Sequence, residues 1–406
     1  MSERKEIILG RPYLEQSKGC VRLCSDIVSG ESTVTAWFEV KDEYAGCLTD
    51  DRLDAFVAAF IYKAVTEDMD IRCEAPVSRR LLYQLNEYLL PALAGNIASF
   101  HSVHVYAGPT DIRLSSRKTV ATGWTGGADS MYTLMKMREA AEPDMRLTHL
   151  LIANNGALES DHNEELLRHL VKKAENGIAK DTGLSVIGVN TNLDRIFCET
   201  YLAVAGYRLP AAVLALQKLF SVFYNSAGYE FSRFSFVAEN SAYYEMFILP
   251  NLSTENTVIY SAGGAASRLQ KLKELSGYPL AQKYLHPCIY TSRPNCGECR
   301  KCIVTQLALY AMGTLDRFDK VFDLEWFYAN KDRYIAKAIV GRAGQHYGEA
   351  YWLLKEKGLI TERARQLARE MQAAETIAAK NRETLARYFP YDHSRKRLAR
   401  GPAAPA

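Results

Sequence analysis

Short apolar runs alternate with helical patterns between residues 118 and 320, and this alternation restricts the possible folds more than any other feature. It predicts an α/β domain with a parallel sheet and helices on both faces. In such sheets ligands bind beyond the carboxyl ends of the strands. The expected strands are Val120–Trp124, Leu147–Ala153, Leu184–Val189 and Phe234–Ala238, and the expected helices are Ser130–Glu139, 161–182 (mostly helical) and Pro210–Tyr224.

A glycine turn follows the first of these strands, in the segment Thr125-Gly-Gly-Ala-Asp-Ser130. Adjacent Gly126 and Gly127 let the backbone approach a phosphate closely, and the first helical turn offers unpaired amides and partial positive charge. Asp129 is a candidate Mg²⁺ ligand, and the Ser130 hydroxyl a candidate phosphate contact. An ordinary turn with a helix cap has similar residues. The segment is neither a Walker A loop nor a dinucleotide fingerprint.

The two flanking segments differ from this core. Residues 1–117 read as a small α/β accessory domain, with strands expected at Glu6–Leu9, Val21–Ile27, Thr33–Val40, Asp70–Cys73 and Val103–Tyr106 and helices at Asp51–Thr66 and Ser78–Leu93. Residues 321–406 read as a helical extension, in which Thr361 caps a long helix to about Tyr388. Ala364, Leu367, Met371 and Ala374 would form its packing face. The basic tail from Ser394 is either solvated or an RNA or phosphate contact.

Composition excludes several functional classes. The chain has 406 residues, 48% hydrophobic residues and a net charge of +3, which fit a protein of two or three domains and give no general case for nucleic-acid binding. No apolar run is long enough to cross a bilayer, and the charged N-terminus lacks a signal-peptide core. We therefore expect a cytoplasmic protein with no membrane partner.

Four of the nine cysteines fall within fifteen residues, at positions 288, 296, 299 and 302. A reducing cytoplasm disfavours a disulfide framework, whereas four soft thiolates suit a closed, tetrahedral zinc site with a structural role. Cys288, Cys296, Cys299 and Cys302 are thus the expected Zn²⁺ ligands, in a knuckle whose charge Arg300 and Lys301 partly offset. The spacing differs from the usual ferredoxin pattern, and a redox Cys-x-x-Cys pair would leave two cysteines unexplained.

The glycine turn and the cysteine knuckle, in this order, resemble features of a known family. Thr125-Gly-Gly-Ala-Asp-Ser130 resembles the Ser-Gly-Gly-x-Asp-Ser signature of the PP-loop ATP pyrophosphatases, and the Cys-x₇-Cys-x₂-Cys-x₂-Cys spacing is similar to that of the 7-cyano-7-deazaguanine synthases among them. The resemblance covers residues 118–320 and departs from the signature at Thr125, which keeps the hydroxyl. It implies a PP-loop/HUP-like fold with ATP and Mg²⁺ as ligands. The residues it implies at the nucleotide are Trp124, Thr125, Gly126, Gly127, Ala128, Asp129, Ser130 and Ala153.

Further polar residues are candidates for the chemistry. Arg268 and Lys271, one helical turn apart, would reach the phosphates as catalytic cations beside Asp129 and Ser130, although an exposed cationic helix surface explains them equally well. Candidates for contact with the acceptor substrate are Glu239, Asn240, Tyr243, Glu245 and Glu255.

The resemblance implies an AMP- and pyrophosphate-forming ligase. Such an enzyme adenylates a carboxylate or carbonyl oxygen of a small acid or nucleoside-like molecule, for example a 7-carboxy-7-deazaguanine-like acid, and ammonia or an amine then displaces AMP. One alternative is an RNA- or nucleoside-directed sulfurtransferase or amidase, in which Cys198 would carry a persulfide. The apolar neighbours of Cys198 instead favour an inert, packed thiol. Another is a non-catalytic, zinc-stabilised nucleotide-binding module. A homodimer is possible.

Overall fold

The computed structural model describes residues 4–156, 158, 163–196, 199–291 and 293–388. Its centre is a set of parallel strands in the order β13-β12-β9-β10-β11. Their bounds are β9 (Thr119–Gly123), β10 (His149–Ala153), β11 (Ser185–Thr191), β12 (Phe220–Ser226) and β13 (Val258–Ala262). The expected α/β class with a mostly parallel sheet is confirmed.

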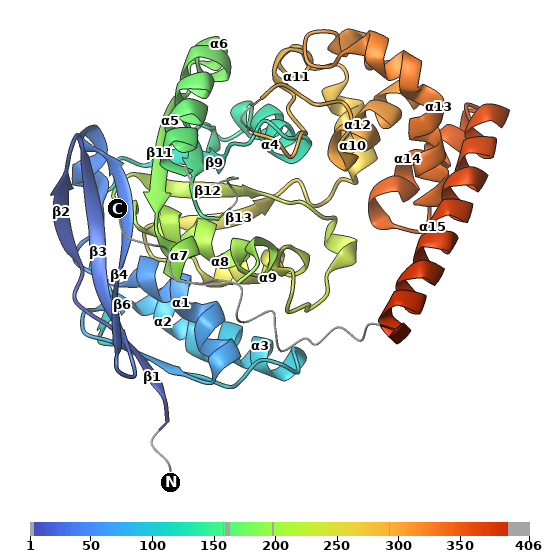
Figure 1. Cartoon of the computed structure of the whole chain (residues 1–406). Helices are drawn as coiled ribbons and strands as arrows, with labels where there is room; N and C mark the ends of the chain where they lie inside the picture. Colours follow the sequence, from blue (N-terminus) through green and yellow to red (C-terminus); the bar gives the residue numbers. More distant parts are fainter. Residues whose placement is uncertain (1–3, 157, 159–162, 197–198, 292, 389–406) are drawn as a thin grey trace, which may run out of the picture.

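Helices cover both faces of these strands (Figure 1). Successive residues of a strand point to opposite faces, so neighbours such as Val120 and Ala121 belong to two different apolar cores. One core holds α4 (Ala128–Arg138), α5 (Asn163–Ala174), α10 (Arg268–Leu275) and α11 (Pro279–Tyr284), and the other holds α8 (Tyr201–Leu214) and α9 (Glu245–Asn251). Short helices α6 (Lys180–Thr182) and α7 (Leu193–Ile196) flank β11.

Two expectations for the second half of this sheet are wrong. The helix expected over Pro210–Tyr224 is instead the end of α8, a turn and the strand β12, while Phe234–Ala238 forms no strand. A short apolar run that is buried on both faces shows neither helical nor strand periodicity in its sequence. Its conformation is therefore determined by pairing with neighbouring strands. The aromatic rings of Phe234 and Phe236 pack against each other from irregular backbone. β13 was not anticipated.

The first segment continues the same sheet. β4 (Ser32–Lys41) pairs antiparallel with β11, and the order continues through β3 (Cys20–Ser29), β1 (Glu6–Leu9), β5 (Asp70–Cys73) and β7 (Val105–Tyr106), with β2 (Tyr13–Ser17) on β3. β6 (Val77–Ser78) pairs separately with β8 (Pro109–Thr110). The helices are α1 (Asp54–Glu67), α2 (Arg79–Gln84) and α3 (Leu90–Asn96), and α1 packs against α8. The division into residues 1–117, 118–320 and 321–406 stays a prediction.

The last segment is helical, as expected. It comprises α13 (Leu324–Val340), α14 (Gln345–Glu356) and α15 (Glu362–Tyr388), which follow α12 (Arg300–Ala311). The Thr361 hydroxyl accepts a hydrogen bond from the Ala364 amide and so caps α15. Ala364 is buried and Leu367 and Met371 are half-buried, whereas Ala374 is exposed. The basic tail lies outside the described residues.

Several short helical turns connect these elements. π-helical turns span Leu85–Leu89 and Glu175–Ala179, and 3₁₀ turns span Asp42–Cys47, Pro143–Met145, Phe231–Arg233, Ser241–Tyr243 and Leu315–Phe318. Among the described residues, no helix has the length and apolar character needed to cross a membrane.

Candidate functional site

The glycine turn lies where the strand order reverses. Across the sheet the parallel strands lie in the order β11, β10, β9, β12 and β13. The chain passes from β9 to β10 on one side, whereas β12 lies on the other side of β9. In open α/β sheets this switch point opens a crevice at the carboxyl ends of the strands. The turn follows β9 directly, and α4 begins at Ala128, two residues before the expected Ser130.

Gly126 is the position in this turn that only glycine fits well. Its φ of +73° lies in the left-handed region, and an added Cβ would stand 3.1 Å from the His286 Cβ. The Gly126 carbonyl accepts a hydrogen bond of 2.7 Å from the His286 amide. The turn is therefore held closely against the segment that leads into the cysteine knuckle.

The hydroxyls of Thr125 and Ser130 brace the turn from inside. The Thr125 Oγ1 accepts from the Gly127 amide at 3.2 Å, and the Ser130 hydroxyl donates to the Gly127 carbonyl at 3.1 Å. The two hydroxyl oxygens are 3.2 Å apart. Gly127 is the N-cap of α4, so the first amides of this helix lie beside the braced turn.

Asp129 meets both of the predicted cations. Its Oδ2 accepts from Arg268 at 2.7 Å and its Oδ1 from the Lys271 ammonium at 3.0 Å. Lys271 is only 1% exposed and also donates to the Ala227 carbonyl, just after β12, at 2.7 Å. Ser267 and Gln270 form a capping box that fixes the start of α10, so both cations reach the turn from one rigid helix.

Glu245 adds a second, buried carboxyl to the same edge. It accepts hydrogen bonds from Asn225 at the end of β12 (2.9 Å) and from Ser261 near the end of β13 (3.1 Å). Burial raises the pKa of Glu245 to about 8, while the Ser261 hydrogen bond lowers it and the charge of Asp129 raises it further. At neutral pH this carboxyl is therefore mostly protonated beside a cationic cluster.

The other acceptor candidates divide into two groups. Tyr243 stacks on Tyr229, with ring centroids 4.3 Å apart, and both line a small pocket together with Glu245. The Asn240 amide donates to the Tyr229 hydroxyl at 3.2 Å. Glu239 is exposed, whereas Glu255 accepts from the Arg80 amide at 2.8 Å and so binds the first segment.

The next strand edge carries the residues expected at the adenine. The Trp124 amide donates to the Leu151 carbonyl at 2.8 Å, and Ala153 ends β10. Asn154 follows and is 2% exposed, and its Oδ1 has no hydrogen-bond donor in the described part of the chain. A buried amide oxygen of this kind usually has a partner, so Oδ1 of Asn154 is an unsatisfied acceptor beside the end of β10.

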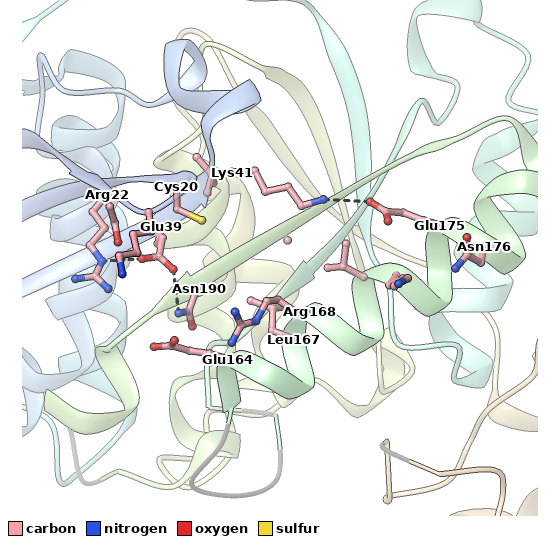
Figure 2. A pocket seen from close by; sticks show the side chains of 16 residues that line it. Cys20, Arg22, Glu39, Lys41, Glu164, Leu167, Arg168, Glu175, Asn176 and Asn190 are labelled. Atoms are coloured by element: carbon pink, nitrogen blue, oxygen red, sulfur yellow. Dashed lines mark hydrogen bonds and ion pairs between the residues drawn. The ribbon is translucent and has the colours of Figure 1, made fainter.

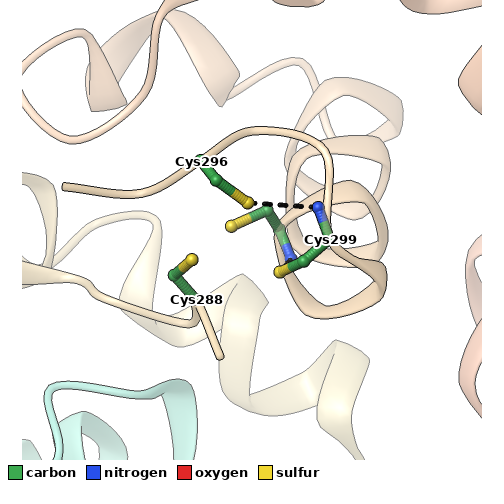
Figure 3. Close-up of side chains that lie close together, drawn as sticks. Cys288, Cys296 and Cys299 are labelled. Atoms are coloured by element: carbon green, nitrogen blue, oxygen red, sulfur yellow. Dashed lines mark hydrogen bonds between the residues drawn. The ribbon is translucent and has the colours of Figure 1, made fainter. Parts of the chain in front are cut away.

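The four cysteines of the knuckle converge as predicted (Figure 3). The Sγ atoms of Cys288, Cys296, Cys299 and Cys302 all lie within 4.8 Å of one another, so the cluster could hold a metal ion. Sulfurs about 2.3 Å from a tetrahedral zinc would be separated by about 3.8 Å, which is compatible with this spacing.

Hydrogen bonds from neighbouring residues shape the knuckle. The Cys299 amide donates to the Cys296 sulfur at 3.2 Å, and the Cys302 amide donates to the Cys299 sulfur at 3.4 Å. Asn295 donates to the carbonyls of Leu285 (3.0 Å) and Val321 (2.9 Å). The cluster is therefore fixed between α11 and the start of α13. Cys198, the other cysteine considered, lies outside the described residues.

Sequence reasoning missed several partners at this site. Asn225, Ala227 and Ser261 contact Glu245 or Lys271 only because β12 pairs with β9 and β13 pairs with β12. The sequence pattern predicts no strand at Asn225 and no strand at β13. No sequence signal therefore indicates that these residues lie near Glu245 and Lys271. Comparison of the chain with protein-family models, curated proteins and solved structures finds no match.

Proposed function

We propose that this protein is an ATP-dependent ligase that forms AMP and pyrophosphate at the crevice beside the glycine turn. The observation that carries the proposal is the contact of Arg268 and buried Lys271 with Asp129, at the first turn of α4 and at the switch point of the sheet. Cations, helix amides and a carboxylate at one strand edge are what a nucleotide polyphosphate with Mg²⁺ requires.

The proposed roles follow from charge. The amides of the first turn of α4, with Arg268 and Lys271, bind the β- and γ-phosphates and stabilise the charge that develops on departing pyrophosphate. Asp129 holds Mg²⁺ together with phosphate oxygens. Each Asp129 oxygen accepts one hydrogen bond and keeps a second lone pair, so the carboxylate fits that role. Bound Mg²⁺ would supply further neutralisation of the phosphates.

The reaction then has two displacements. A carboxylate or carbonyl oxygen of the acceptor attacks the α-phosphorus, and the bond to the bridging oxygen breaks to release pyrophosphate. Ammonia or an amine next attacks the activated carbon, loses a proton and expels AMP. Positioning of the reactants contributes most of the acceleration in such transfers.

We assign the adenine to the edge formed by Trp124, Ala153 and Asn154. Backbone polar groups at the ends of β9 and β10 would contact the base. The acceptor would lie nearer Glu245 and the stacked Tyr229–Tyr243 pair, where a flat acid of the 7-carboxy-7-deazaguanine type would lie over an aromatic ring and contact a protonated carboxyl.

Zinc is the metal we propose for the knuckle. Its donor set is four sulfurs with no further described ligand, which favours a structural rather than a catalytic ion. Through the bond from the His286 amide to the Gly126 carbonyl, the bound ion would hold the glycine turn in place.

The test uses ATP labelled at the α-phosphate. Purified protein is incubated with Mg²⁺, ammonia and a panel of small acids that includes 7-carboxy-7-deazaguanine. We expect label in AMP and equimolar pyrophosphate with one of the acids, and loss of both in Asp129→Ala. Production of ADP, or activity unchanged by Asp129→Ala, would contradict the proposal. ATP binding without pyrophosphate release for every acid would favour a nucleotide-binding module instead.

A further inference from the structure

A cavity beside β11, lined by neither Asp129 nor its cationic partners, has the features of a ligand site. It has a volume of about 440 Å³, which lies in the range of small-molecule pockets. Its walls come from α5, β11 and the hairpin of β3 and β4 (Figure 2), and we call it the α5 groove. None of the residues of the glycine turn or the cation cluster lines it.

Strand register explains why polar groups gather on this face. Arg22 on β3 lies opposite Glu39 on β4, which in turn lies opposite Asn190 on β11. Cys20 and Lys41 are the next opposed pair on the same face. On the other wall, Arg168 and Lys172 are one helical turn apart on α5 and so share a side of the helix.

The charges of the α5 groove do not cancel. Arg22 pairs with Glu39 at 2.7 Å, and Lys41 pairs with Glu175 at 3.4 Å. Lys18, Arg168 and Lys172 also line the groove and form no ion pair with any described residue. Among the described carboxylates that line the groove, Glu164 is the one without an ion pair. The groove therefore keeps an excess of positive charge, and an arginine among these cations suits bidentate contact with phosphate.

The uncharged lining groups distinguish between kinds of anion. The described residues that line the groove include Ser17 and Asn176, whose side chains make no described hydrogen bond, and include no aromatic ring. A nucleobase would thus find no stacking partner, while hydroxyl groups would find amide, hydroxyl and carboxylate partners. Leu167 and Val171 give the floor an apolar strip.

From these contacts we propose that the α5 groove binds a phosphorylated polyhydroxy compound, such as a sugar phosphate. Arg168, Lys172 and Lys18 hold the phosphate, and Asn176 with Ser17 holds the hydroxyl groups. This site is separate from the proposed nucleotide site and does not depend on it.

The experiment is a calorimetric titration of the full chain with ribose 5-phosphate and glucose 6-phosphate. Inorganic phosphate, succinate and AMP serve as comparison probes. We expect a sugar phosphate to bind at least tenfold more tightly than inorganic phosphate. Lys172→Met and Arg168→Met should each weaken this binding about tenfold, because each removes one charge-assisted contact.

Matched variants separate a built site from general attraction. Lys173 is adjacent to Lys172 and also exposed but does not line the groove, so Lys173→Met should leave binding unchanged. Asn176→Ala should weaken sugar phosphate about fivefold and leave inorganic phosphate unaffected.

Other results would overturn the proposal. Absence of sugar-phosphate binding would do so, and so would an equal loss with Lys173→Met, which would indicate non-specific charge. Equal affinity for inorganic phosphate would refute the assigned ligand class. Tighter binding of succinate, or of AMP in a manner that Arg168→Met and Lys172→Met weaken, would refute it as well. The variants carry exposed substitutions, and an unchanged melting temperature would show that they remain folded.

Discussion

Lys271 joins three parts of the molecule through one buried ammonium group. It contacts Asp129 on α4 and the Ala227 carbonyl after β12, and it comes from α10. Because only 1% of its surface is exposed, water cannot replace these contacts if the ammonium is removed. The residue therefore contributes to stability as well as to the proposed chemistry.

Replacement of Lys271 by Met should lower the free energy of unfolding by about 2 kcal/mol, because Asp129 and the Ala227 carbonyl lose a donor. The double variant Lys271→Met/Asp129→Asn should recover part of this loss. Chemical denaturation measures both, and Lys273→Met, an exposed change on the same helix, is the control. Strict additivity of the two single changes would argue against a direct interaction.

Glu245 makes stability depend on pH in a defined direction. Burial raises its pKa from 4.5 to about 8 in the folded protein, so the folded state keeps a proton that the unfolded state releases. The free energy of unfolding should therefore fall as pH rises from about 5 through about 8, and no loss should occur below about pH 4.5.

Glu245→Gln removes this dependence, since the amide is neutral throughout. Relative to this variant, the wild-type protein should lose about 3 kcal/mol between about pH 5 and 7.5. Denaturation curves at several pH values provide the measurement, with Glu239→Gln as an exposed control. Parallel curves for wild type and Glu245→Gln would show that the carboxyl is already ionised in the folded state.

The turn between β9 and α4 shows how much of an element can be predicted locally. The glycines of this turn and the helix after it can be predicted from short-range sequence pattern. The same holds for the four cysteines of the knuckle. The brace between Gly126 and His286 cannot be predicted in this way, because its residues lie far apart in the sequence and meet only after the sheet has formed.

Gly126→Ala tests the turn as an element. The variant faces a φ of +73° and the His286 Cβ at 3.1 Å, whereas Gly183, with a φ of +72°, has open space around it. Both alanine variants should lose about 1 kcal/mol of stability from backbone strain. Only Gly126→Ala should also weaken binding of ATP with Mg²⁺, by at least tenfold in a calorimetric titration. Equal affinity of the two variants for ATP would show that the turn does not contact the nucleotide.

Removal of metal from the knuckle should loosen the same turn. The purified protein should contain about one zinc per chain, and a strong chelator should lower its melting temperature and its affinity for ATP together. Cys299→Ser should reproduce both effects. A metal-free protein that melts at the same temperature would contradict the assignment of zinc.

At the scale of the whole molecule, the alternation of strands and helices predicts the class and most of the elements up to β11. It could not predict β12 and β13, whose short apolar runs become strands only where β12 pairs with β9 and β13 pairs with β12. Nor could it predict that β4 pairs with β11, since Glu39 and Phe38 lie about 150 residues from Asn190 and Thr191. Long-range pairing of this kind has no local signal.

This pairing makes residues 1–117 part of the sheet that carries the site. The Asn192 side chain accepts from the Trp37 amide at 3.0 Å and donates to the Thr35 carbonyl at 2.8 Å, and α1 shares a core with α8. A fragment of residues 118–388 should therefore fail to give the single cooperative transition expected of the full chain. Circular dichroism during denaturation measures this, and a fragment with a sharp native-like transition would indicate an independent domain.

We have proposed that the crevice beside the glycine turn binds ATP with Mg²⁺. The most direct test is calorimetric titration of the wild-type chain with Mg²⁺ and α,β-methylene ATP, which cannot be cleaved between the α- and β-phosphates. We predict one nucleotide per chain, at least tenfold weaker binding to Lys271→Met and unchanged binding to Lys273→Met. No binding to the wild-type chain, or equal binding to Lys271→Met, would contradict the account.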